Sequence, residues 1–302
     1  MPLDFATAIE RTHGAIRQRD AAALAQTLSN LGYGMDANNL TQEGERPLNV
    51  AASIGFAAGC QVLLNNGANP MLASDANTDR GFLPISFAMR CTDTAATLAT
   101  CRCLVGAGAD IERTHEHAGH PPPLRTVVGA REINLELACG LLELGASIAS
   151  WPNYLHWQTS RTDITPESLG AAVALAAGKI PAANASRVTA LHSLCASPSV
   201  TAKLVKTLKS VTEGVKSKEG TLPVTLLCRN PAVDEDTLQA VLEGLPRGMS
   251  VSDCTGSAGI HDLCKNPSWN YKIAKIAARY DPEGLKVRDP NKSTALHLTC
   301  LR

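Results

Sequence analysis

Gly44-Glu45-Arg46-Pro47-Leu48-Asn49-Val50-Ala51-Ala52-Ser53-Ile54-Gly55 opens the stretch of sequence that decides the fold, and Leu63-Leu64-Asn65-Asn66-Gly67-Ala68-Asn69 closes it. Pro47 suits the first turn of a helix, where the N–H that proline lacks would have no intrahelical acceptor. Gly67 follows an apolar helical run, and a glycine there ends a helix because it adopts the left-handed conformation without a Cβ penalty. The stretch therefore predicts a turn, a short helix, a second helix and a glycine stop.

The same unit recurs through the first half of the chain. The phrases that end it are Gly34-Met35-Asp36, Gly67-Ala68-Asn69, Gly108-Ala109-Asp110 and Gly145-Ala146-Ser147, with glycines 33, 41 and 37 residues apart. Pro-Leu or Pro-Ile follows the first three of them, at Pro47, Pro84 and Pro123. A period of this length is typical of stacked repeats, in which each unit buries its apolar face against its neighbours.

In these residues the chain resembles the ankyrin repeat family. Arg46 and Asn49 stand where the family usually has Thr and His, so the resemblance does not carry over the hydrogen bonds of those two side chains. The unit from Pro84 to Gly108 has both a lengthened helical pair and a lengthened finger loop. Insertions in such arrays fall on loops, often on a binding face.

The second half repeats a different phrase that ends in cysteine. Its four copies end at Cys195, Cys228, Cys264 and Cys300, which are 33, 36 and 36 residues apart. A turn and a helix-capping residue follow the first three copies, at Thr201, Asp234 and Asn270. These units also resemble ankyrin repeats, of a divergent kind in which Ser-Pro or Asn-Pro follows the first helix.

The sequence thus predicts an all-α fold, an ankyrin-repeat solenoid of stacked helix-turn-helix units with finger loops. We expect residues 1–150 to form an N-terminal block of about four units, the first one capping. Residues 188–302 form a divergent C-terminal block of three units and a partial fourth. Residues 151–187 join the blocks as a linker, a degenerate repeat or a binding element. The partial unit leaves an apolar face uncapped, which suggests a truncated chain, a further domain or weak self-association of an otherwise monomeric protein.

Charge is balanced over the whole chain but not within its halves. The 28 Lys+Arg equal the 28 Asp+Glu, which argues against general nucleic-acid binding. Residues 1–150 hold 10 Arg, no Lys and 15 acids, whereas residues 151–302 hold 18 Lys+Arg and 13 acids. We expect the acidic block to favour basic partners and the lysine-rich block acidic ones, with salt weakening both.

Composition also indicates where the protein works. No apolar stretch approaches the roughly 20 residues that span a membrane, and the N-terminus shows no secretory signal. The 10 cysteines then imply a reducing compartment, and we expect the cytoplasm, with the nucleus as the alternative.

The residues that carry function are expected on the surface. The finger-loop candidates for partner binding are Asp75, Asp79, Arg80, Glu112, Arg113, His115 and His117, and the junction candidates are Trp151, Tyr154 and Trp157. The three aromatic residues either fill the junction or form an interface hot spot, where Trp and Tyr dominate. The resemblance implies a non-catalytic scaffold that binds proteins through fingers and concave face. The alternative is a recruiting or regulatory region of a larger enzyme whose catalytic domain lies outside this chain.

Patterns that suggest catalysis or metal binding fail on spacing. His115-Glu116-His117-Ala118-Gly119-His120 lacks the i, i+4 histidines of a zincin helix, and Gly119 with the prolines that follow opposes a helix. Cys101 and Cys103 lie two apart on a helix, so they cannot face one metal. His192, His261 and His297 fall on separate layers and favour structural hydrogen bonds, and the repeated cysteines fill one core position per unit. We therefore expect no catalytic residue, metal site or cofactor.

Overall fold

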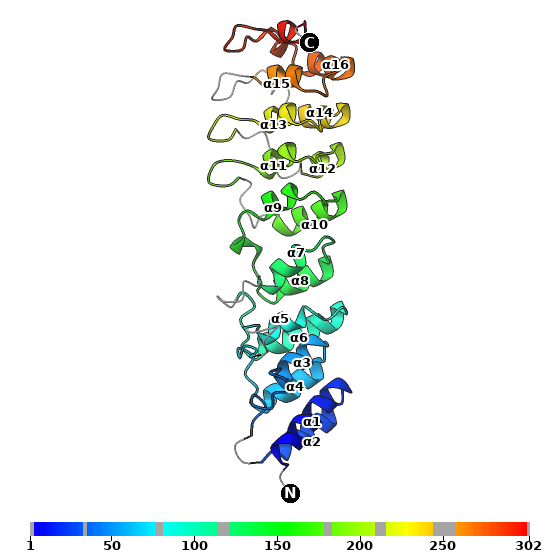
Figure 1. The fold of residues 1–302 in the computed structure, drawn as a ribbon, viewed down its shortest axis with the longest axis vertical. Coiled ribbons are helices and arrows are strands. Elements are labelled where there is room, and N and C mark those ends of the chain that lie inside the picture. Colours follow the sequence, from blue (N-terminus) through cyan, green and yellow to red (C-terminus); the bar gives the residue numbers. More distant parts are fainter. Residues whose placement is uncertain are drawn as a thin grey trace. The chain divides into compact units, whose positions relative to one another are not determined.

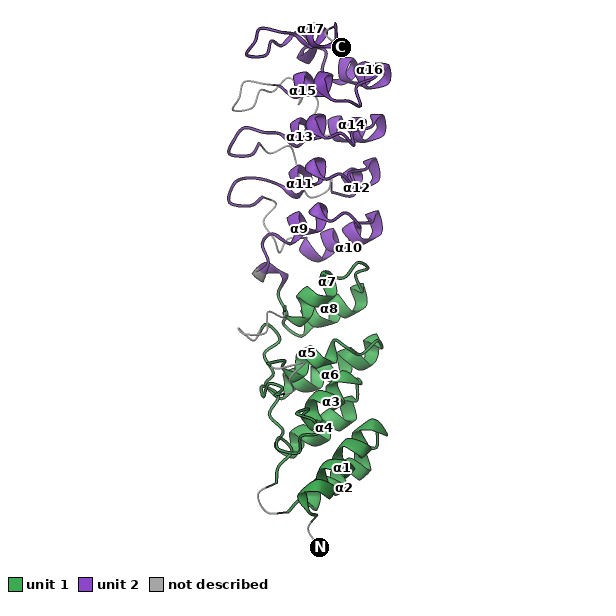
Figure 2. Cartoon of the chain, in the orientation of Figure 1, with its two compact units in different colours: residues 1–147 green, residues 148–302 purple. Residues whose placement is uncertain are grey.

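The computed structural model describes residues 3–32, 35–75, 81–113, 121–177, 183–208, 216–243 and 258–300. Within these ranges the chain forms α-helices, short 3-10 turns and two isolated β-bridges, without an extended strand. It divides into two compact units, which we call unit 1 (Met1–Ser147) and unit 2 (Ile148–Arg302) (Figure 2). The all-α prediction is therefore confirmed for the described residues.

The described residues of unit 1 form helix pairs. The pairs are α1 (Phe5–Arg17) with α2 (Ala21–Ser29), α3 (Pro47–Ser53) with α4 (Ala57–Asn65), α5 (Pro84–Ala88) with α6 (Thr94–Gly106), and α7 (Pro123–Val128) with α8 (Leu135–Glu143). The second helices α2, α4, α6 and α8 pack in that order, and α1, α3 and α5 do likewise. Each pair is thus one layer of a stack (Figure 1).

The residues that predicted the helix ends of unit 1 occupy those ends. Pro47, Pro84 and Pro123 lie in the first turns of α3, α5 and α7. Gly67, Gly108 and Gly145 have φ values of 85°, 95° and 98°, in the left-handed region that ends a helix. The short helices of unit 1 are therefore delimited by their own sequence.

Unit 2 also consists of stacked helix pairs. Its elements are η1 (Ile148–Ser150), α9 (Tyr154–Ser160) with α10 (Pro166–Ala176), α11 (Ala190–Ala196) with α12 (Ala202–Leu208), α13 (Pro223–Arg229) with α14 (Glu235–Leu242), α15 (Gly259–Lys265) with α16 (Tyr271–Tyr280), η3 (Gly284–Lys286) and α17 (Ala295–Cys300). The first helices form one column beside the finger loops, and the second helices form another (Figure 1). A partner that approaches from the finger side would therefore meet the first helices.

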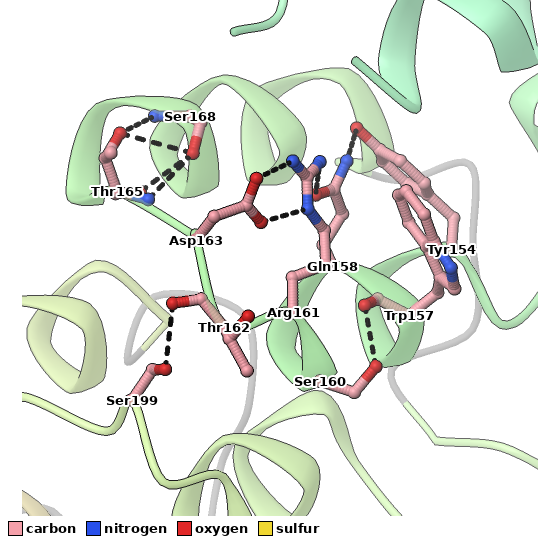
Figure 3. A network of polar contacts seen from close by, with 10 residues as sticks. All are labelled: Tyr154, Trp157, Gln158, Ser160, Arg161, Thr162, Asp163, Thr165, Ser168 and Ser199. Atoms are coloured by element: carbon pink, nitrogen blue, oxygen red, sulfur yellow. Dashed lines mark hydrogen bonds and ion pairs between the residues drawn. The ribbon is translucent and has the colours of Figure 1, made fainter. Parts of the chain in front are cut away.

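Residues 151–177 form the first helix pair of unit 2. Thr165 caps α10, and Pro166 takes the first helical position. The turn of this pair is bonded to the next layer, because Ser199 Oγ donates to Thr162 O over 3.0 Å (Figure 3). Ser268 Oγ donates to Pro231 O over 2.7 Å in the same way two layers later. The pair α9–α10 is therefore stacked as the later pairs are.

Three histidines of unit 2, of which His192 and His261 are buried, each link their layer to the next one. The Nε2 atoms of His156, His192 and His261 lie 2.8, 3.0 and 3.0 Å from carbonyl oxygens in the finger of the next layer. Nδ1 of His192 accepts a hydrogen bond from Thr189 N over 3.0 Å. Nε2 of the neutral ring therefore carries the hydrogen and donates it to Thr221 O. The structural role predicted for the repeated histidines is confirmed for His192 and His261.

A second link between the layers is made by asparagines that follow the first helices. Asn230 Nδ2 donates to Cys195 O over 3.0 Å and to Ser197 O over 2.7 Å. Asn266 Nδ2 donates to Cys228 O over 2.9 Å and to Asn230 O over 2.8 Å. Each asparagine thus donates to two carbonyls at the C-terminal end of the first helix in the preceding layer, where carbonyls have no intrahelical donors.

The repeated cysteines differ in their surroundings. Cys195, Cys228 and Cys264 are fully buried, as the core position predicts. The prediction is wrong for Cys300, which is exposed, because no described helix packs on the outer side of α17.

Unit 1 differs from unit 2 at the two positions where its sequence departs from the ankyrin pattern that it resembles. Arg46 donates to Asn38 O over 2.7 Å and to Ala73 O over 3.0 Å, and it pairs with Asp75. Asn49 is completely buried, and neither its amide nitrogen nor its amide oxygen has a hydrogen-bond partner. Arg46 thus bonds neighbouring turns together, whereas the Asn49 side chain contributes no such bond.

Candidate interaction surface

The structure brings the aromatic residues of the junction together. The ring centroids of Trp151 and Tyr154 are 5.2 Å apart, as are those of Trp151 and Trp157. Trp157 is 38% exposed on α9, and Trp151 is half-buried beside it. Tyr154 is fully buried. The assignment of Tyr154 as a partner-binding residue therefore requires correction, because its ring packs beneath the tryptophans and offers no surface to a partner.

Arg161 supports the exposed tryptophan. Its guanidinium lies 5.2 Å from the centroid of the Trp157 ring. Asp163 holds the guanidinium with two hydrogen bonds, at 2.9 Å from Nε and 3.0 Å from Nη2 (Figure 3). A two-point contact of this kind fixes the plane of the arginine. The exposed indole therefore has a preorganised cation beside it whose charge Asp163 balances.

The network continues into the core of the layer. Arg161 Nη1 donates to Gln158 Oε1 over 3.3 Å, and Gln158 Nε2 donates to Tyr154 Oη over 3.2 Å (Figure 3). Burial raises the pKa of Tyr154 to about 12, although the Gln158 hydrogen bond and the Arg161 charge oppose the rise. The phenol of Tyr154 is therefore neutral near pH 7. The hydrogen bonds from Tyr154 through Gln158 to Arg161 help to fix the position of Arg161 beside Trp157.

Two of the three described finger candidates of unit 1 bond within the chain. Asp75 pairs with Arg46, and Glu112 Oε1 accepts a hydrogen bond from Ser147 N over 2.9 Å. Arg113 is exposed. The structure therefore gives Asp75 and Glu112 roles in joining turns, and it does not bring them together as a site. Asp79, Arg80, His115 and His117 lie outside the described residues.

Sequence reasoning missed Arg161, Asp163 and His156. A signal for His156 was present, because His156 precedes His192 by 36 residues, the same spacing that separates the later cysteines of unit 2. That register places Arg161 at the end of a first helix, four residues after Trp157 and on the same face. Leu155-His156 repeats Leu191-His192, but Tyr154 in place of Ala190 concealed the match.

Two solved structures resemble this arrangement of helix pairs and fingers. The ankyrin repeat domain of Bcl-3, a member of the IkappaB protein family, superposes with a TM-score of 0.56 at 18% identity, over 76% of this chain and 97% of that one. An ankyrin repeat protein from Leishmania major superposes with a TM-score of 0.53 at 16% identity, over 93% of this chain and 98% of that one. The chain has the ankyrin repeat fold.

Sequence comparison alone does not reach this result. No protein-family model matches the chain, and no curated protein matches it either. The ankyrin fold is therefore recognised from the arrangement of the helices and from the short sequence phrases that delimit them. Overall sequence identity to the two solved structures is low, at 18% and 16%.

Several thiols in the described part of this ankyrin fold are buried, whereas Cys139 and Cys300 are exposed. Burial raises the pKa of Cys101 to about 12 and raises the pKa of Cys195 and Cys228 above the ordinary range. The thiolate is the nucleophilic form of cysteine, so these three are inert at neutral pH. Among the described residues no group of three or more His, Cys, Asp or Glu could hold a metal ion. The histidines at 115–120 lie outside those residues.

Membrane insertion finds no support in the described helices. None of them combines the length and the apolar character that crossing a bilayer requires.

Proposed function

We propose that this chain is a non-catalytic protein-interaction scaffold and that Trp157 anchors a partner protein on the finger side of unit 2. The observation that carries the proposal is the exposed indole of Trp157, packed against Trp151 and held beside the Arg161–Asp163 pair. An ankyrin fold generally serves protein interaction, and the fold by itself does not name a partner.

The physical case rests on the low entropy cost of binding to a fixed surface. Trp157 has few rotatable bonds, and its neighbours Trp151 and Arg161 already restrict it. Aromatic anchors in such positions contribute about 2 kcal/mol or more to binding. The paired charge of Arg161 adds a polar rim without leaving an unbalanced charge under the partner.

Affinity capture from cell extract tests the proposal. The immobilised full chain is compared with Trp157→Ala and with Tyr271→Ala, a matched variant because Tyr271 is 81% exposed on the second-helix column of the same unit. We expect Trp157→Ala to retain its partner at least about 30-fold less tightly, the factor that 2 kcal/mol represents. Tyr271→Ala should retain the same proteins as the unmodified chain.

Two results would contradict the proposal. One is that all three forms retain the same proteins equally. The other is that the two variants lose them equally, since this would show that the exposed aromatic surface in general, and not Trp157, holds the retained proteins. Circular dichroism of each variant checks that the helices are intact.

A further inference from the structure

Three finger loops in the described part of unit 2 share one hairpin geometry, and the finger between the second and third of them lies outside the described residues. In each, the first residue donates its backbone N–H to the carbonyl of the fifth. The three pairs are Asn184–Val188 at 2.9 Å, Ser217–Thr221 at 3.0 Å and Asp289–Ser293 at 2.9 Å. Corresponding positions therefore recur at the same place in each of these layers, and a partner that runs along the fingers meets them in turn (Figure 1).

Cations occupy the exposed positions of these hairpins. We call the set Arg187, Lys216, Lys218, Arg288 and Lys292 the basic finger edge; all five are exposed, and none forms an ion pair with a described residue. The acids in the same described hairpins are Glu219, which is exposed, and Asp289, which is buried. The edge therefore carries a net positive charge that no described residue pairs with.

A hollow of about 460 Å³ opens between the first two of these hairpins. The half-buried side chains of Val188 and Leu226 give the hollow an apolar part. The rest of its lining is polar and includes both Lys218 and Glu219. Lys218 N donates to Ser186 O over 2.9 Å, so the two hairpins are bonded to each other. The hollow is therefore part of a continuous edge and has room for one apolar side chain.

We propose that the basic finger edge binds an acidic, extended segment of a partner protein, and that one apolar side chain of this segment enters the hollow beside Leu226. The proposal rests on the proposed scaffold function and names the chemistry of its partner. Charge complementarity selects the acidic segment and speeds its association, and the apolar lining selects the side chain between the acids.

The composition of the edge favours a protein over a nucleic acid. Proteins that bind single strands stack the bases on aromatic side chains. The described hairpin residues 183–189, 216–222 and 287–294 contain no Phe, Tyr or Trp. The apolar lining of the hollow is aliphatic, which suits leucine or valine and does not provide a stacking surface.

Fluorescence anisotropy with the full chain tests the proposal directly. The probe is a fluorescein-labelled oligoglutamate peptide with one central leucine. We expect binding that weakens as salt rises and that falls about tenfold or more in Lys216→Glu/Lys218→Glu. The matched control is Lys203→Glu/Lys206→Glu, which reverses two exposed charges on α12 in the second-helix column and should bind like the unmodified chain.

The hollow is tested separately. Leu226→Ser should weaken the leucine peptide several-fold, and a peptide with glycine in place of the leucine should bind both forms equally. The proposal is overturned if the peptide does not bind, if both double variants lose it equally, or if single-stranded DNA of equal charge binds as tightly. If the peptide does not bind but capture of a partner still depends on Trp157, the scaffold function stands and only the acidic-segment proposal fails. If the peptide binds as expected but capture does not depend on Trp157, only the Trp157 anchor fails.

Discussion

In unit 2 buried side chains bond one layer to the next, through His192 and His261 to the fingers and through Asn230 and Asn266 to the helix ends. In unit 1 the position that the sequence aligned with a histidine holds Asn49, which is equally buried and makes no bond. Within its described residues, unit 1 has one such histidine link, in its first layer, because His13 Nε2 lies 2.9 Å from Leu40 O. The link recurs in unit 2, whereas the next layer of unit 1 holds a buried amide without a hydrogen-bond partner.

Unit 1 gains cohesion from close packing of small residues. A Cβ atom placed on Gly55 would lie 2.6 Å from Cys91 Sγ and 2.9 Å from Ala96 Cβ. In unit 2 a Cβ on Gly259 would lie no closer than 3.4 Å to any neighbour, which is ordinary contact. The comparison suggests that unit 1 tolerates added volume poorly and that unit 2 tolerates loss of polar groups poorly.

The two units can be followed separately in one chain. All three tryptophans, Trp151, Trp157 and Trp269, belong to unit 2. Tryptophan fluorescence in a urea titration therefore reports unit 2, whereas far-ultraviolet circular dichroism reports the helices of both units.

The largest effect is expected from Gly55→Ala. Gly55 has a φ of 69°, which costs alanine about 1–2 kcal/mol. The contact with Cys91 adds about 1–3 kcal/mol of overpacking. We expect unit 1 to lose about 3 kcal/mol, seen as an earlier dichroism transition.

Gly259→Ala is the matched substitution in unit 2. Because Gly259 begins α15 and its added methyl meets only ordinary contacts, we expect the fluorescence midpoint to change by no more than about 0.5 kcal/mol in free energy. Equal losses for the two substitutions would end the claim that close packing distinguishes unit 1.

Replacing a buried asparagine by alanine is expected to have a somewhat smaller effect on stability. The effect should differ between Asn230 of unit 2 and Asn49 of unit 1. Asn230→Ala leaves the carbonyl of Cys195 without its donor and leaves that of Ser197 with only the N–H of Val200, at 3.3 Å. We expect a loss of about 2–3 kcal/mol in the fluorescence transition. Asn49→Ala removes an amide that has no partner, so relief of its desolvation offsets the lost volume. We expect Asn49→Ala to be neutral or stabilising by about 1 kcal/mol in the dichroism transition.

This pair tests the central comparison most directly. A large destabilisation by Asn49→Ala would mean that unit 1 relies on its buried amide as unit 2 does. An unchanged stability of Asn230→Ala would mean that the asparagine links of unit 2 contribute nothing.

The sequence predicted the helix ends well because they depend on local chemistry. Pro47 and Gly67 act through their own backbone preferences, and Asp234 acts through a carboxylate that accepts from Thr237 N over 2.7 Å. Such signals need no knowledge of the neighbouring layers, so they could be recognised one residue at a time.

The candidate site was only partly predictable because it depends on neighbours that the sequence does not order. The clustering of Trp151, Tyr154 and Trp157 was visible, but which ring is buried depends on how α9 packs on α10 and α11. Arg161 gave no isolated signal, and its role arises from the position of Asp163 and the face of Trp157. Finger residues such as Asp75 looked free, because their partners lie in other turns.

The smallest effect is expected from pH, and it shows whether the histidine links differ between the units. Burial lowers the pKa of His192 below its ordinary value of 6.5; the carbonyl of Thr221 opposes this shift, and the nearby His156 adds to it. Burial likewise lowers the pKa of His13, where the carbonyl of Leu40 opposes the shift and Arg17 adds to it. The unfolded chain therefore binds more protons than the folded chain as pH falls through about 6.5, and the stability present above that pH is lost below it.

His192→Gln separates the contribution of unit 2 from that of unit 1. In the unmodified chain both the fluorescence and the dichroism transitions should move to lower urea when pH is lowered from about 7.5 to about 5.5. In His192→Gln the fluorescence transition should lie at a lower urea concentration already at pH about 7.5, because the bond to Thr221 is weakened. Its midpoint should also depend less on pH. The pH dependence that His13 confers on unit 1 should remain in the dichroism signal. If the fluorescence transition of His192→Gln kept the full pH dependence, the link at His192 would not be the one that acid breaks. The pH dependence of unit 2 would then come from another titratable group.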